Sequence, residues 1–146
     1  YGAVGRDEEA LSMRREVYSG RLKLQGEEHR DSLLAAEALA DSLLALRQFA
    51  ELKSLLQKTT LVARRVLGEK HVDTLKMRWL YANALFEDDC ATLDDLREAV
   101  ETLGSVAPLW TRVFGSSHPD TPCVQRALED ARKVLAARAS ASSSGA

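Results

Sequence analysis

The three histidines of the chain are the residues whose types and spacing come nearest to a chemical site. They occur in three related octets, GEEHRDSL, GEKHVDTL and GSSHPDTP, which begin at Gly26, Gly68 and Gly115. Each octet has Gly first, His fourth, Asp sixth and Ser or Thr seventh. Because imidazole and carboxylate groups are zinc ligands, a metal site is the first chemistry to test.

The spacing argues against a shared metal ion. Zinc requires ligand atoms about 2.0–2.3 Å from one centre. His29, His71 and His118 are 42 and 47 residues apart, and they occupy equivalent places in a repeat whose helix layers lie on the order of 10 Å apart. They do not converge on one ion, so no metal site is predicted, and the imidazoles are expected to pack and hydrogen-bond in the joints between helices.

Other chemical sites find little support. The acidic run around Cys90 lacks the alternating spacing of a calcium loop. Cys123 has only His118 as a nearby base, and the chain contains no GxSxG, HExxH or glycine-rich phosphate loop. No catalytic residue and no cofactor are therefore predicted, and the chain is not expected to be an enzyme.

Composition narrows the class of protein further. The 146 residues are 45% hydrophobic, with 20 basic and 22 acidic side chains, so no positive excess points to nucleic acid. Charged residues interrupt every apolar stretch well short of the roughly 20 residues that cross a bilayer. No membrane insertion is expected. Two isolated cysteines favour a reducing compartment, with the cytoplasm as the default.

The octets separate segments with helical spacing. The 19 residues before each glycine are DEEALSMRREVYSGRLKLQ, FAELKSLLQKTTLVARRVL and LREAVETLGSVAPLWTRVF, and apolar residues also recur at helical spacing after each octet, for example Leu33, Ala36, Leu39, Ala40 and Leu43. The glycine suits the left-handed end of one helix. Asp31, Asp73 and Asp120 then offer side-chain oxygens and negative charge to the N–H groups of the next.

A helix pair of 42 residues with G-x-x-H-x-D-T-L at its joint resembles the tetratricopeptide repeat (TPR) of the kinesin-light-chain type. The resemblance covers almost the whole chain, and Tyr1, Gly5 and Asp7 fall into the same register. It implies an all-α, right-handed TPR-like solenoid of antiparallel helix pairs. In one respect the chain departs from the family, because kinesin-light-chain repeats place Asn where this chain has Glu37, Trp79 and Arg126. The cargo preference of that family is therefore not carried over.

The repeats divide the chain into five segments. An incomplete first repeat occupies 1–25, with the end of one helix followed by a second helix at 7–25. Full repeats follow at 26–67 and 68–114, and the second is expected to carry five extra residues in the turn around EDDCATLDD. A capping helix is predicted at 115–139, and a disordered tail at 140–146 because ASASSSGA offers little apolar surface.

By resemblance, the first helix of each pair lines the concave face of the array. The residues 5, 8, 12 and 15 positions after each histidine are then expected to point into the groove. Four of them lie at its edges: Leu34, Leu44, Cys123 and Lys133. Aromatic side chains between opposite charges suit peptide recognition. The predicted contact residues are Glu37, Asp41, Lys76, Trp79, Asn83, Phe86, Arg126 and Asp130.

Two functions follow from this interpretation. The first is a non-catalytic module that binds a partner peptide or helix in the concave groove. The alternative is a structural subunit or fragment of a larger multi-protein assembly, which makes its contacts through the convex face and the open ends of the array. Both imply a protein partner.

Overall fold

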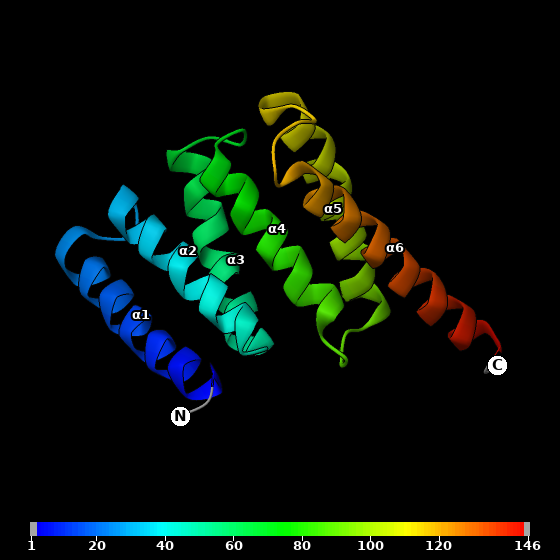
Figure 1. Ribbon diagram of the computed structural model, residues 1–146, viewed down its shortest axis with the longest axis horizontal. Helices are drawn as coiled ribbons and strands as arrows, with labels where there is room; N and C mark the ends of the chain where they lie inside the picture. The colour runs from blue at the N-terminus through cyan, green and yellow to red at the C-terminus, as the bar shows by residue number, and fades with distance from the viewer. Residues whose placement is uncertain (1–2, 145–146) are drawn as a thin grey trace. The chain divides into compact units, whose positions relative to one another are not determined.

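The computed structural model describes residues 3–144, and within this range it consists of six α-helices and no strand (Figure 1). The predicted all-α fold is confirmed. No helix in the described range is both long and apolar enough to span a bilayer. The helices are α1 (Ala3–Gln25), α2 (Arg30–Ala45), α3 (Phe49–Val66), α4 (Val72–Glu87), α5 (Leu93–Phe114) and α6 (Thr121–Ser144).

Packing divides the chain into two compact units, Tyr1–Leu80 and Tyr81–Ala146, with the boundary inside α4. In the first unit α1 packs on α2 and α2 packs on α3, and in the second α5 packs along α6. The apolar residues at helical spacing form the core of each unit. Each large side chain removed from water contributes on the order of 2 kcal/mol, and the fully buried ones include Leu33, Leu43, Leu52, Leu56, Leu96, Leu103, Trp110 and Val124.

The extra length of the second full repeat is shared between a loop and a helix. The loop between α4 and α5 has five residues, 88–92, against three, 46–48, between α2 and α3. Helix α5 has 22 residues against 18 in α3. It starts with a capping box, in which Thr92 and Asp95 each bond the backbone N–H of the other. Because this box defines the start of α5, the inserted residues lengthen the helix as well as the turn.

Both ends of the described chain are more helical than the sequence predicted. Helix α1 starts at Ala3 and runs through Gly5, where the resemblance placed a break between helices. Glycine lowers helix propensity by about 1 kcal/mol relative to alanine but does not itself end a helix. Helix α6 continues to Ser144, past the predicted start of the disordered tail at 140, because Ala and Ser in this stretch tolerate helix and no Gly or Pro intervenes. Tyr1, 145 and 146 lie outside the described residues.

The glycine that opens each octet ends a helix, as predicted. Gly26, Gly68 and Gly115 have φ values of 84°, 96° and 83°, which favour a residue without Cβ. A Cβ atom added at any of the three would meet nothing within 4 Å. The requirement is therefore conformational and not one of space.

The histidine of each octet caps the helix that follows. His29 Nδ1 accepts a hydrogen bond from the backbone N–H of Asp31 at 3.0 Å. The same bond recurs from His71 to the N–H of Asp73 at 3.1 Å and from His118 to the N–H of Asp120 at 3.0 Å. The sequence assigned this acceptor role to the aspartates, and that assignment is wrong. Asp31 and Asp73 do place negative charge in the first helical turn.

In two of the octets, the threonine hydroxyl donates a hydrogen bond to a carbonyl at the end of the preceding helix. Thr74 Oγ1 donates to the carbonyl of Ala63 near the end of α3, at 3.3 Å, and Thr121 Oγ1 donates to the carbonyl of Gly115 at 2.8 Å. Both carbonyls also accept backbone N–H groups, so the threonine adds a further donor to each. In the first joint Ser32 takes the place of threonine, and its buried hydroxyl makes no hydrogen bond with the described residues.

The cap leads to a prediction that distinguishes two contributions to stability: the hydrogen bond accepted by the histidine ring nitrogen, and the packing of the ring itself. His71→Ala is expected to lower the free energy of unfolding by about 1 kcal/mol, whereas His71→Asn should retain most of it, since Asn is a good helix cap. Urea denaturation followed by circular dichroism measures both. Equal losses in the two variants would show that ring packing, and not the hydrogen bond, holds the joint.

Candidate functional site

The eight predicted contact residues are divided equally between the two units. In the first unit, Glu37 and Asp41 lie on α2, and Lys76 and Trp79 lie on α4. The remaining four, Asn83 and Phe86 on α4 and Arg126 and Asp130 on α6, belong to the second unit. Each group is described below within its own unit, together with the single helix α4 that both units share.

Helix α4 has one buried face and one partly exposed face. Leu75, Ala82 and Leu85 are buried, with exposed fractions of 2% or less. The other face carries the four predicted residues at spacings of three and four, which place them in one stripe along the helix. All four are half-buried, and we call them the α4 stripe: Lys76, Trp79, Asn83 and Phe86.

A polar cluster lies beside this stripe in the first unit. Glu37 of α2 and Asp73 of α4 expose only 14% and 11% of their side chains. Lys76 Nζ lies 4.0 Å from Glu37 Oε1, and its side chain is 41% exposed. Glu37 thus has a second carboxyl group, that of Asp73, and the ammonium of Lys76 as neighbours in a largely dehydrated place, where desolvation disfavours its charged form.

Burial and the neighbouring Asp73 carboxyl together raise the pKa of Glu37 to about 8, with Lys76 opposing the shift and Asp41 adding to it. The Glu37 Oε2 atom is buried and accepts no hydrogen bond from the described residues. A proton on this carboxyl lets it donate to the carboxylate of Asp73. At neutral pH Glu37 is therefore mostly uncharged.

Sequence reasoning missed Asp73 as a member of this cluster. Its position in the octet indicated only a role at the start of a helix. A signal was available, because Asp73 precedes Lys76 by three residues and so shares a face of α4 with it.

The second unit places Arg126 and Asp130 on the exposed side of α6, one helical turn apart. The opposite side of α6 buries Val124, Ala127 and Ala131 in the core of this unit. Predicted edge residue Cys123 is also exposed, with a free thiol. Both predicted contact residues are therefore accessible to solvent.

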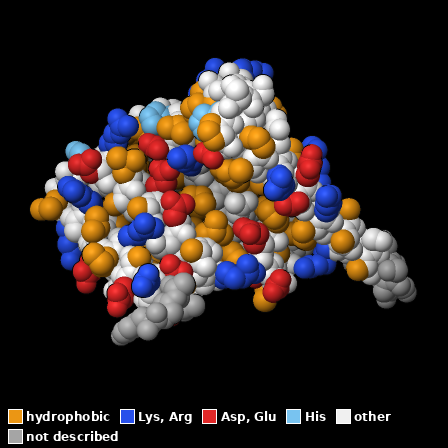
Figure 2. All heavy atoms as spheres, viewed as in Figure 1, with side chains coloured by type: hydrophobic (Ala, Val, Ile, Leu, Met, Phe, Trp, Pro, Cys, Tyr) orange, Lys and Arg blue, Asp and Glu red, His pale blue; other side chains and the backbone are white. Residues whose placement is uncertain are grey.

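The surroundings of these residues carry mixed charge. On the face drawn in Figure 2, basic and acidic side chains are interspersed with apolar ones. Among the residues that the structure describes, no three His, Cys, Asp or Glu side chains are placed to hold a metal ion. In each cap His Nδ1 is used as an acceptor, so in the neutral ring Nε2 carries the proton and offers no lone pair to a metal.

Comparison with known proteins supports the fold. No protein-family model matches the chain, and no curated protein matches it in sequence. Two crystal structures of TPR-like repeats from a kinesin light chain-like protein of Podosopora anserina, one of them a single-substitution variant, do match its structure. Their TM-scores are 0.78 and 0.79, with 25% identity over 89% of this chain. The chain spans 59% of the length of each.

The fold is therefore that of a TPR-like repeat solenoid, and its structural neighbours are kinesin light chain-like repeat proteins, as the octets indicated. This fold is generally that of a protein-interaction module, it is typically non-catalytic, and it implies protein partners.

The raised pKa of Glu37 predicts a pH dependence of stability. The folded chain keeps this proton up to about pH 8, whereas a glutamate of ordinary pKa, 4.5, has released it. Between these values the folded state binds more protons, so stability falls as pH rises, by up to about 5 kcal/mol for the full change of pKa from 4.5 to about 8. Glu37→Gln should remove this decline and be more stable than wild type above pH 8.

The measurement is urea denaturation at a series of pH values from 5 to 9, compared between wild type and variants. The matched control is Glu101→Gln, an exposed glutamate of α5, which should leave the wild-type slope in place. A Glu37→Gln variant with the same slope as wild type would show that this carboxyl is not the group that titrates.

Proposed function

We propose that the chain is a non-catalytic module that binds a segment of a partner protein along the α4 stripe. The observation that carries this proposal is that α4 leaves two large aromatic side chains, Trp79 and Phe86, only half-buried on the same face as Lys76 and Asn83. A core helix ordinarily buries its aromatic residues. Here they lie where a partner segment can cover them.

The aromatic rings would supply most of the binding free energy. Covering the remaining apolar surface of two large rings contributes a few kcal/mol, and aromatic residues are enriched among those that dominate interfaces. Because Trp79 and Phe86 are seven residues apart on one helix, two apolar side chains of the partner about 10 Å apart would match them. A helix with apolar residues at i and i+7, or a polyproline II segment with apolar residues three apart, meets this spacing.

The polar residues would set the register of the bound segment. Lys76 is 41% exposed, and the carboxyl group 4.0 Å from its Nζ, that of Glu37, is mostly protonated at neutral pH. An acidic or amide group of the partner is therefore favoured at this end of the stripe. Asp41 on α2, and Arg126 and Asp130 on the exposed side of α6, stay predicted contacts within their own units.

The proposal is tested by replacing Trp79. Labelled peptides selected for binding to the wild-type chain should bind Trp79→Ala about tenfold or more weakly, as loss of an aromatic interface residue does. Fluorescence anisotropy of the label measures the affinity without relying on tryptophan emission. The matched control is Leu61→Ala, which truncates a 62% exposed apolar residue on α3 and should bind as wild type. Unchanged affinity of Trp79→Ala for every peptide would contradict the proposal.

A second candidate function is a structural subunit of a larger assembly. One observation favours it: Met13, Val17 and Leu24 are 66%, 52% and 83% exposed, and their spacing places them on one side of α1. If contacts through this side join copies of the chain permanently, light scattering should give a mass above that of one chain at micromolar concentration. A monodisperse monomer would contradict permanent self-association.

A further inference from the structure

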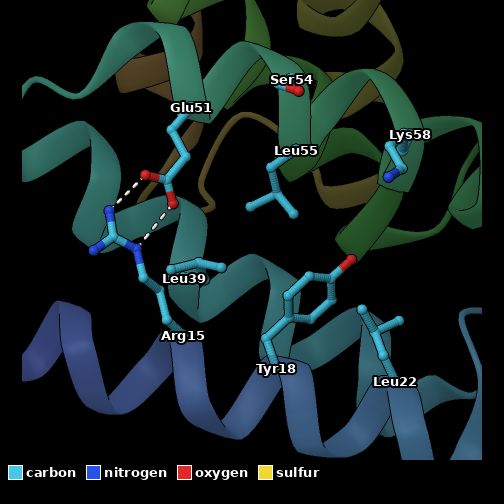
Figure 3. Close-up of a pocket in the computed structure, with 8 residues that line it drawn as sticks. All are labelled: Arg15, Tyr18, Leu22, Leu39, Glu51, Ser54, Leu55 and Lys58. Atoms are coloured by element: carbon cyan, nitrogen blue, oxygen red, sulfur yellow. Dashed lines mark hydrogen bonds and ion pairs between the residues drawn. The ribbon is translucent and has the colours of Figure 1, made fainter.

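A cavity of about 380 Å³ lies within the first unit, between α1 and α3, with α2 beneath it (Figure 3). Its apolar wall is formed by Leu22 of α1, Leu39 of α2 and Leu55 of α3, and the ring of Tyr18 points into it from α1. A smaller space of about 70 Å³ adjoins it and shares Tyr18, Leu22 and Lys58. The volume is in the range of ligand-binding pockets.

One end of the cavity is closed by an ion pair. Arg15 Nε donates to Glu51 Oε2 at 3.0 Å, and a terminal nitrogen of the same guanidinium donates to Glu51 Oε1. This pairing joins α1 to α3 with two parallel hydrogen bonds, a geometry that fixes both side chains. Because the two charges pair with each other, this end of the cavity offers a ligand little beyond van der Waals contact.

The other end carries donors that no residue of the described chain engages. Lys58 of α3 makes no ion pair or hydrogen bond with the described residues, and the hydroxyl of Tyr18 makes no hydrogen bond with them. Burial and the nearby charge of Glu27 raise the pKa of Tyr18, so its hydroxyl stays protonated and can donate. The side chains around the larger cavity include Arg15 and Glu51, which pair with each other, and Lys58, and Glu27 adds a negative charge beside the adjoining space.

We propose that this cavity is a docking site for a segment of a partner protein that carries a large apolar side chain next to a carboxylate. The apolar side chain would lie against Leu22, Leu39 and Leu55, and the carboxylate would accept from Lys58 Nζ and the Tyr18 hydroxyl. An acidic group complements these two donors, which no described residue engages. The site lies on α1 and α3 and does not involve the α4 stripe, so the chain would hold partners at two separate surfaces.

The probes are short peptides, acetylated at the N-terminus and amidated at the C-terminus, in which Leu, Phe or Trp is followed by Asp, Asn or Lys. Backbone amide shifts in NMR spectra of the labelled chain report where each peptide binds. At roughly millimolar peptide, the Asp peptides should shift amides of α1 and α3 around the cavity. The Asn peptides should bind several-fold more weakly, and the Lys peptides should bind least.

Two variants make the test independent of any single substitution. Lys58→Glu should weaken the Asp peptides about tenfold and favour the Lys peptides, because it reverses the charge at the open end. Ser54→Trp, at an exposed residue that lines the cavity, should fill the space and abolish binding of all peptides. The matched control is Lys133→Glu on the exposed side of α6, which should bind as wild type.

Several results would overturn the proposal. They are an absence of shifts with every Asp peptide, shifts confined to the α4 stripe, equal binding of Asp and Lys peptides, or undiminished binding in Ser54→Trp. Circular dichroism confirms that each variant is folded. Trp79→Ala should leave cavity binding unchanged, so failure at this site and failure at the α4 stripe are separate outcomes.

Discussion

The structure depends on how each joint satisfies the backbone groups that two helix ends leave without intrahelical partners. A helix end exposes about four N–H or carbonyl groups, and reversing the chain within four to six residues places two such ends together. The octet contributes three residues to the joint: glycine takes the positive φ, histidine Nδ1 accepts an N–H, and in the second and third octets threonine donates to a carbonyl. Because these bonds are local, the joint can be repeated at intervals of 42 and 47 residues.

This use of histidine explains how a motif with the residue types of a metal site serves as a joint between helices. The acceptor nitrogen of each imidazole is occupied by a backbone N–H two residues later. His118 is held further by Trp110 and Phe114, whose ring centroids lie 5.4 and 5.2 Å from its own. Because the imidazoles hold the joints between helices, the candidates for binding a partner are the residues on the surfaces of the helices.

The sequence predicted the helix pairs and the glycine ends because both follow from local pattern: apolar spacing and the φ preference of one residue. It misassigned the cap because aspartate is the commoner capping residue, whereas histidine reaches the same N–H through a ring nitrogen. The raised pKa of Glu37 could not be predicted from the sequence, because it depends on burial of this side chain against Asp73 of another helix. The cavity beside Tyr18 depends on the separation of α1 and α3, which no residue pattern encodes.

The polar cluster beside α4 and the cavity between α1 and α3 use different residues of α2. Glu37 belongs to the polar cluster beside α4, and Leu39 forms part of the cavity wall between α1 and α3. Two residues along an α-helix correspond to a rotation of about 200°, so these side chains leave α2 on nearly opposite sides. A segment bound at either surface therefore does not block the other. Communication between the two surfaces would have to pass through α2 itself, whose buried residues Ala36, Ala40 and Leu43 are fixed in the core.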